Sequence, residues 1–213
     1  MSNELDKLNP ALRYEMSSHV ADMVRMAVAA EGVESMMLPA ASVTAAHEAG
    51  HCVIAAAQGL QPWCAWVKYC SAGRGYTGAT DFHPDAPGIH INPVEEPEAA
   101  INRAAFSLAG WAGESLFEPA GLKLGSSLDE LAVAGALIRS AAHGLDANPE
   151  ELWNRVLGAT MWVLTQETAT VRRIQRILLQ EGRVRGPKLH RLLSGIPKRD
   201  MPALIGIAVE RQP

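Results

Sequence analysis

Residues 44–51 read Thr-Ala-Ala-His-Glu-Ala-Gly-His, and the rest of the chain is best interpreted outward from this stretch. It contains His47-Glu48-x-x-His51, the pattern of a zinc peptidase helix. Side chains four positions apart lie on one face of an α-helix, so both imidazoles can bind one metal ion. The alternative is two histidines on a polar helix face, but the helical context around them favours the metal site.

Glu48 follows the first histidine directly, so its carboxylate can point at a water molecule on the metal. Zinc lowers the pKa of such a water molecule, and a neighbouring carboxylate can take its proton. The pattern therefore predicts Glu48 as a general base for hydrolysis. Gly50 costs about 1 kcal/mol of helix propensity relative to alanine, which indicates a packing or functional reason for it.

Two histidines leave a zinc site one protein ligand short. Asp129 lies at an expected helix start, where an acid is also favoured by the helix dipole. Ser127-x-x-Glu130 at the same place also fits a capping box. The residues alone leave four candidates for the third ligand, which are Glu114, Asp129, His83 and His90.

The chain is expected to be mainly helical with one small β-hairpin, because alanine, leucine and arginine are abundant. Ser42 or Thr44 is expected to cap the zinc helix, and Gly59 to follow its end. The pattern predicts helices at about 42–58, 97–117, 127–143, 148–182 with a bend or break, and 186–195.

Two β-prone runs around a glycine-rich turn predict the hairpin at residues 63–82. Gly78 in its second run indicates a bulge or a close backbone approach. The four prolines of residues 83–97 predict an irregular loop. We expect a helical extension at 1–40 with an apolar stripe, a main domain at 41–200 and a C-terminal tail at 201–213.

Two further segments resemble a known family. Leu108-Ala109-Gly110-Trp111-Ala112-Gly113-Glu114-Ser115 is similar to a Leu-Gly-Gly-Arg-x-Ala-Glu-Glu block, and Gly125-Ser126-Ser127-Leu128-Asp129 to a Gly-Ala-x-Asn-Asp block. Both blocks and the zinc motif belong to the peptidase domain of the FtsH family of membrane-bound, ATP-dependent zinc proteases. The resemblance covers about residues 44–194, with departures at Trp111, Ser115 and Leu128.

The resemblance implies a zinc metalloendopeptidase. The last acid of the family's second block is its third zinc ligand, which implies that Asp129 binds Zn²⁺ together with His47 and His51. Glu114 then becomes a group that orients an imidazole. In the family the second hairpin strand is exposed, which implies that an extended substrate adds to about Tyr76–Phe82 as a further strand.

The family also carries an ATPase module and membrane helices, but this sequence contains no Gly-x-x-x-x-Gly-Lys-Ser/Thr phosphate loop. We therefore expect cleavage of peptides or unfolded proteins without an ATPase of its own. A separate ATPase partner and a homo-oligomer are the assemblies that the resemblance implies. The alternative is a catalytically idle, zinc-stabilised interaction module that uses the edge strand or the basic helix, which would leave Glu48 without an obvious purpose.

Composition narrows the class of protein. The 213 residues are 48% hydrophobic with a net charge of −4, which argues against bulk binding to nucleic acid. Three cysteines exclude a fully paired disulfide framework. No apolar run approaches the ~18 residues of a membrane span, and the first residues lack a signal-peptide pattern. These features predict a cytoplasmic protein without a membrane segment.

Residues 171–199 are strongly basic, with nine Lys or Arg and one acid, Glu181. A solvated helix face is the ordinary interpretation of such a stretch. A docking surface for an acidic partner or for nucleic acid is the alternative.

Overall fold

The computed structural model describes residues 38–72, 74–83, 95–121 and 127–207. Residues 1–37 of the expected extension, with their apolar stripe, lie outside this part, as do most of the proline-rich loop with His90 and the last six residues. The described part is mainly helical with a small three-stranded sheet, which confirms the expected fold class.

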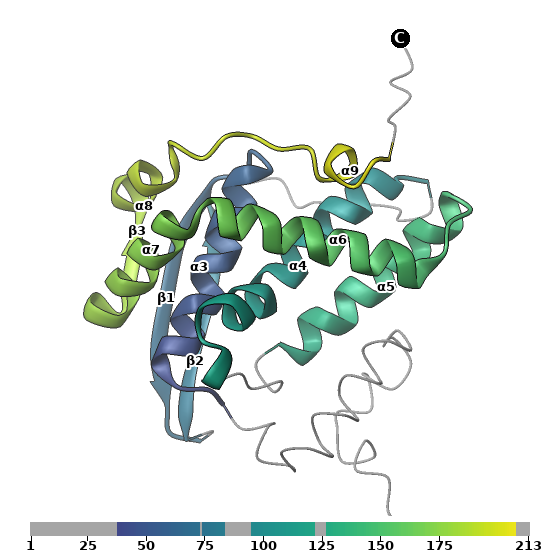
Figure 1. Cartoon of the computed structure of the whole chain (residues 1–213). Helices are drawn as coiled ribbons and strands as arrows, with labels where there is room; N and C mark the ends of the chain where they lie inside the picture. Colours follow the sequence, from purple (N-terminus) through teal and green to yellow (C-terminus); the bar gives the residue numbers. More distant parts are fainter. Residues whose placement is uncertain (1–37, 73, 84–94, 122–126, 208–213) are drawn as a thin grey trace, which may run out of the picture.

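Helix α3 (Ala41–Ala57) carries the His-Glu-x-x-His motif through the centre of the molecule. It packs against the sheet on one side and α4 (Pro97–Phe117) on the other, as Figure 1 shows. Nearly all of its side chains are buried, which suits a helix rich in alanine that is covered all round. The predicted cap was wrong, because Ala40 precedes the helix and no side chain caps it. Gly59 follows the helix end with a left-handed φ of 81°, as expected.

Small residues let α3 and α4 approach until their backbones touch. A Cβ on Gly50 would collide with the carbonyl oxygen of Ala109, and one on Gly113 would lie 2.6 Å from the carbonyl oxygen of Ala46. The helix-breaking cost of Gly50 thus has a packing reason. This close crossing places the α4 side chains directly against the zinc motif.

The expected hairpin is present as β1 (Pro62–Cys70) and β2 (Gly75–Phe82), paired antiparallel. A third strand, β3 (Arg183–Arg185), pairs with the other side of β1 and was not predicted. The strand order β2-β1-β3 leaves β2 at an edge of the sheet. Helix α3 packs against both β1 and β2, so the edge strand runs beside the motif.

The remaining helices surround this centre. The expected long helix at 148–182 is broken at Glu167 into α6 and α7, and Asn148 caps the first of them. Met201, in the expected tail, is fully buried, so the chain still belongs to the core at that point. None of the described helices is long and apolar enough to cross a membrane. The other elements are α5 (Leu128–Gly144), α6 (Pro149–Gln166), α7 (Thr168–Glu181), α8 (Gly186–Leu193), α9 (Met201–Leu204) and the 3-10 turn η3 (Pro119–Gly121).

Candidate metal centre

The two imidazoles of the motif face each other on α3. The Nε2 atoms of His47 and His51 lie 3.1 Å apart, and both side chains are buried. The other ring nitrogen of each is held by an acceptor. The Nδ1 of His51 donates to the carbonyl oxygen of Phe106 at 3.0 Å, and the Nδ1 of His47 lies 2.6 Å from a carboxylate oxygen of Glu114. These bonds keep the protons on Nδ1, so in the neutral rings both Nε2 atoms present lone pairs.

Glu130 on α5 supplies the third group. Its two carboxylate oxygens lie 3.1 Å from the Nε2 of His47 and 3.0 Å from the Nε2 of His51. His47, His51 and Glu130 form a group whose ligand atoms lie within 4.8 Å of one another, and this group could hold a metal ion.

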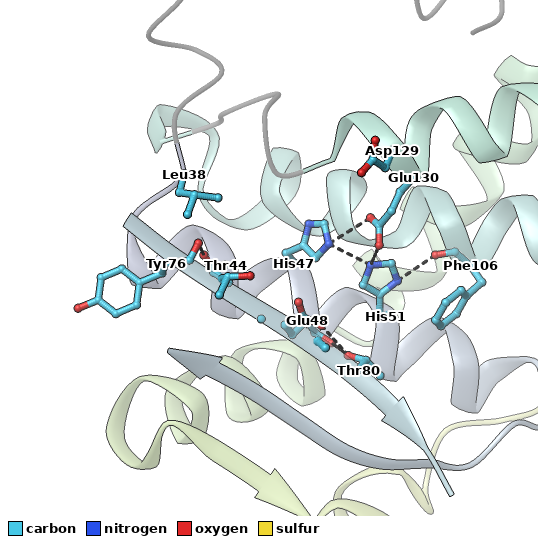
Figure 2. A pocket seen from close by; sticks show the side chains of 13 residues that line it. Leu38, Thr44, His47, Glu48, His51, Tyr76, Thr80, Phe106, Asp129 and Glu130 are labelled. Atoms are coloured by element: carbon cyan, nitrogen blue, oxygen red, sulfur yellow. Dashed lines mark hydrogen bonds and ion pairs between the residues drawn. The ribbon is translucent and has the colours of Figure 1, made fainter. Parts of the chain in front are cut away.

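The implied ligand Asp129 is not part of this group. Its side chain is exposed on the first turn of α5, and Figure 2 shows it lying beyond Glu130 from the two imidazoles. It is one of the residues that line the same pocket. Successive helical residues point about 100° apart, so only one of two adjacent acids can turn toward α3. In the structure, Glu130 rather than Asp129 contacts the two imidazoles.

The donor set is chemically suited to a metal ion. When the rings are neutral, the two Nε2 atoms and the carboxylate of Glu130 are all hydrogen-bond acceptors, and their lone pairs repel one another. A cation bound between them would remove this repulsion. Ligands bound to tetrahedral zinc at 2.0–2.1 Å lie about 3.3 Å from one another. The observed separations of 3.0–3.1 Å are close to that spacing. Side-chain oxygen and nitrogen ligands of this kind are those that zinc accepts in three-ligand sites.

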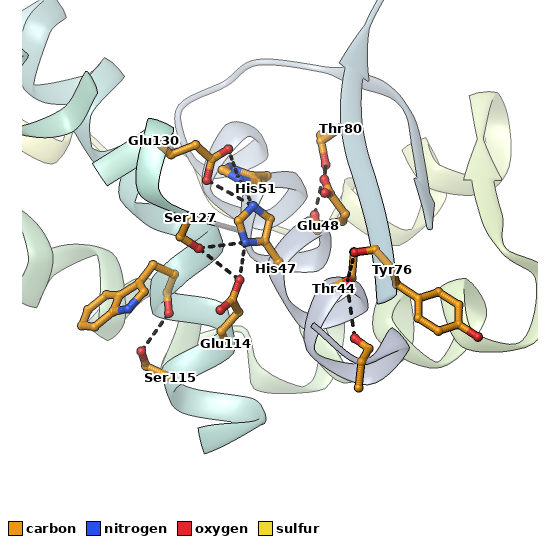
Figure 3. Close-up of polar contacts among 12 residues, drawn as sticks. Thr44, His47, Glu48, His51, Tyr76, Thr80, Glu114, Ser115, Ser127 and Glu130 are labelled. Atoms are coloured by element: carbon orange, nitrogen blue, oxygen red, sulfur yellow. Dashed lines mark hydrogen bonds and ion pairs between the residues drawn. The ribbon is translucent and has the colours of Figure 1, made fainter. Parts of the chain in front are cut away.

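Glu114 on α4 orients His47 rather than joining the cluster. Its side chain is fully buried, and the Oε1 atom that contacts His47 also accepts from the hydroxyl of Ser127 at 3.1 Å (Figure 3). Ser127 and Glu130 therefore do not form the capping box that their spacing suggested, and Ser127 makes no cap hydrogen bond. Both side chains contact the histidines instead. The Ser127-x-x-Glu130 pattern therefore marked residues of the site, although its spacing was interpreted as a helix cap.

The ring of His47 needs a glycine opposite it. A Cβ on Gly110 would overlap the ring and lie 2.6 Å from its Nδ1 atom. Gly110 lies one turn before Glu114 on α4, so the same helix face gives the ring its space and its hydrogen-bond partner. Helix α4 thus fixes the position and the tautomer of His47.

Glu48 lies on the sheet side of the histidines. Its Oε2 atom accepts from the hydroxyl of Thr80 on β2 at 2.8 Å, and Figure 3 shows its carboxylate between His47 and Thr80. A Cβ on Gly78 would lie 2.6 Å from Oε1 of Glu48. The predicted close backbone approach at Gly78 is therefore present, and it makes room for this carboxylate.

Charges within the cluster shift its pKa values. Burial raises the pKa of Glu48, and the charges of His47 and His51 offset this only in part. Burial would also raise the pKa of Glu130, but the two histidine charges outweigh it and hold that pKa well below its usual range. The pKa of His47 lies above its ordinary value despite burial, because Glu130 and Glu114 stabilise its charged form. The carboxylate of Glu130 and the imidazole of His47 thus stabilise each other's charged forms.

One pocket of about 460 Å³ is lined by all four side chains of the cluster, which are His47, Glu48, His51 and Glu130 (Figure 2). Histidines and carboxylates form one wall, and β2 from Tyr76 to Thr80 forms another. Phe106 closes the pocket beside His51, with ring centroids 4.8 Å apart. The volume is within the range typical of sites that bind small molecules or short peptide segments.

Two further histidines were candidates for the third ligand. The ring of His83 packs against Trp63, with ring centroids 5.2 Å apart, and His83 is not part of the metal-binding group. His90 lies outside the described residues. Cys52 follows His51 on α3 but points to Thr80, with its sulfur 3.8 Å from the hydroxyl oxygen.

Comparison with known proteins adds no assignment, because no protein-family model and no curated protein matches the sequence. The chemistry of the site therefore rests on its geometry.

Proposed function

We propose that the protein is a zinc-dependent metalloendopeptidase that cleaves extended, unfolded polypeptides. The observation that carries this proposal is the convergence of His47, His51, Glu130 and Glu48 on one pocket beside an edge strand. A structural metal site has no need of a further carboxylate, such as that of Glu48, beside its ligands, whereas hydrolysis needs a base there.

Zinc fits the donor set, because two imidazoles and one carboxylate are a ligand set that catalytic zinc sites use. When bound, zinc would polarise the carbonyl of a peptide bond and make water acidic enough to lose a proton near neutral pH. His47, His51 and Glu130 would hold the ion, while Glu114 and the Phe106 carbonyl keep the two rings in the binding tautomer.

Glu48 is the group that we assign to proton transfer. Its raised pKa makes it a better proton acceptor than an ordinary glutamate, which suits a base that works near neutral pH. The hydroxyl of Thr80 holds one carboxylate oxygen, and the space left by Gly78 accommodates the other. Glu48 would take a proton from the attacking water molecule and pass it to the leaving amine nitrogen.

The edge strand supports an extended substrate. The N–H and carbonyl of Tyr76 point away from β1, because they bond to Pro39 and Thr44. The two-residue period of a strand directs the backbone groups of Gly78 and Thr80 to the same side. A peptide that pairs with them would run past Glu48 and the histidines, with main-chain hydrogen bonds that tolerate many sequences.

The resemblance to the FtsH peptidase domain also enters as a proposal. The hairpin with its edge strand, the motif helix and an acid at the start of α5 support it. The acid that meets the histidines is Glu130, one residue after the position that the resemblance implied. If the protein is related to that family, it would catalyse the same reaction with a glutamate as the third ligand, whose side chain is one methylene longer than that of the family's aspartate.

The test is a digest of an unstructured protein such as denatured casein. We expect the zinc-loaded protein to cleave it and Glu48→Gln to reduce cleavage by about 10²–10⁴-fold, which is the usual contribution of a general base. Zinc content measured on both proteins should be equal. If both bind zinc and neither cleaves, the centre belongs to an idle interaction module and the proposal fails.

A further inference from the structure

Basic residues are concentrated in one stretch of the chain, residues 171–199. This stretch holds nine of the chain's 19 basic residues and one of its 23 acids, so the rest of the chain is strongly acidic. The stretch contains α7, β3 and α8, which pack against one another at one end of the molecule (Figure 1). In a protein with a negative net charge, this end of the described structure thus carries many cationic side chains.

A groove of about 420 Å³ lies between α7 and α8 in this stretch, lined by Arg173, Ile177, Lys188, Arg191 and Leu192. Residues 173 and 177 are one turn apart on α7, and residues 188 and 192 repeat that spacing on α8. Each helix therefore presents cationic and apolar side chains to the groove. The cations are exposed and the two aliphatic side chains are half-buried, so the groove has an apolar floor and a cationic rim.

Two of the three cations are available to a ligand. Lys188 contacts the carboxylate of Glu181 at 2.6 Å. Within the described part of the chain, Arg173 and Arg191 form no ion pair, and Arg191 uses its Nε to donate to the carbonyl oxygen of Pro187 at 3.3 Å. The terminal nitrogens of both guanidinium groups can therefore bind carboxylates in a bidentate manner.

We propose that this groove docks an acidic protein segment that also carries aliphatic side chains. The carboxylates of the segment would pair with Arg173 and Arg191, and an aliphatic side chain would cover Ile177 and Leu192. Exposed ion pairs alone contribute little, so the apolar floor is needed for stable binding. Single-stranded nucleic acid is disfavoured because its binding grooves use aromatic stacking, and none of the described residues that line this groove is aromatic.

The docking site is separate from the metal centre, since the groove and the metal pocket have no lining residue in common within the described part of the chain. A segment held here would be bound whether or not the protein cleaves peptides. The proposal therefore stands or falls separately from the proposed function.

The test measures fluorescence anisotropy of labelled 12-residue probes with the full-length Glu48→Gln protein, which keeps a probe from being cleaved. The probes are a Glu-Glu-Leu repeat, a Glu-Glu-Ser repeat, a Lys-Lys-Leu repeat and a single-stranded oligonucleotide. We expect the Glu-Glu-Leu probe to bind at least tenfold more tightly than the other three at about 0.15 M salt, where long-range attraction is largely screened.

Two variants with the same change in net charge locate the site. Arg173→Glu with Arg191→Glu should weaken binding of the Glu-Glu-Leu probe at least tenfold. Lys68→Glu with Arg74→Glu, on exposed positions of the β1–β2 hairpin outside residues 171–199, should change it less than about twofold. Circular dichroism checks that both variants are folded.

Leu192→Gln tests the apolar floor without changing charge, and should remove the preference for the Glu-Glu-Leu probe over the Glu-Glu-Ser probe. Equal weakening by both charge variants would overturn the proposal, since attraction would then be general rather than local. Tighter binding of the oligonucleotide would overturn it in favour of nucleic acid. Self-association that the Arg173 and Arg191 variant abolishes would overturn it in favour of a second copy of the chain.

Discussion

Replacing Glu130 with glutamine tests the assignment of the third metal ligand. Both carboxylate oxygens of Glu130 contact the histidine nitrogens, so the substitution removes the charged ligand and keeps its size. Loss of a group that only orients a ligand typically costs 10–100-fold in metal affinity. Loss of a ligand itself should cost about 100-fold or more.

The stability effect follows from this loss of affinity. Zinc at 100 times its dissociation constant stabilises the folded state by about 2.7 kcal/mol, and a 100-fold weaker site reduces this to about 0.4 kcal/mol. For a chain of this size 1 kcal/mol corresponds to about 2–4 °C. The rise in Tm on adding zinc should therefore be about 5–9 °C smaller in Glu130→Gln than in the unmodified protein.

Asp129→Asn is the matched control, because it removes the same charge from the adjacent residue. Its side chain is exposed, so we expect a change in zinc affinity of about twofold at most. The assay is a zinc titration against a chromogenic chelator, followed by thermal unfolding with and without zinc. A variant pattern in which Asp129→Asn loses zinc and Glu130→Gln keeps it would refute the assigned ligand set.

Three further predictions concern the packing of the site. Gly110→Ala should lower zinc affinity about 10–100-fold and destabilise the fold by about 1–3 kcal/mol, because its methyl group overlaps the ring of His47. Zinc titration measures the affinity, and denaturant unfolding measures the stability. Gly78→Ala should keep zinc but lower peptide cleavage, since the methyl group displaces the Glu48 carboxylate; cleavage rate and zinc content are compared on the same sample. Burial raises the pKa of Cys52 to about 12, so alkylation at pH 8 followed by mass spectrometry should find this thiol protected until the protein unfolds.

Gly158→Ala serves as the control for both glycine variants. Gly158 lies within α6, and a Cβ there would meet nothing within 4 Å. The substitution should raise the free energy of unfolding by about 0.5–1 kcal/mol and leave zinc affinity unchanged. Gly110→Ala or Gly78→Ala behaving like Gly158→Ala would show that the close contacts at His47 and Glu48 are absent in solution, and rapid alkylation of Cys52 would contradict its burial.

Local patterns sufficed for most of the helices and for the hairpin. Helix periodicity and the glycine-rich turn depend on neighbouring residues, so the sequence carries them directly. Strand β3 was missed because three residues, Arg183 to Arg185, are too few to show a strand pattern. Their pairing with β1 depends on tertiary contact, which a short segment does not encode by itself.

The candidate site could be predicted only in part, because local sequence patterns determine some of its residues and tertiary contacts determine the others. His47, Glu48 and His51 are fixed by the period of one helix. The choice between Asp129 and Glu130 depends on how α5 is rotated against α3, and one residue changes that direction by about 100°. Ser127 and Glu130 fit a capping box by spacing alone, while their buried partners on other helices could be identified only from the fold.

Anomalous X-ray scattering at the zinc edge, from crystals grown with zinc, tests the central claim most directly. The account predicts a single strong peak about 2.0–2.2 Å from the Nε2 atoms of His47 and His51 and from a carboxylate oxygen of Glu130. Coordination by Asp129 in place of Glu130, or no peak between the two imidazoles at saturating zinc, would contradict it.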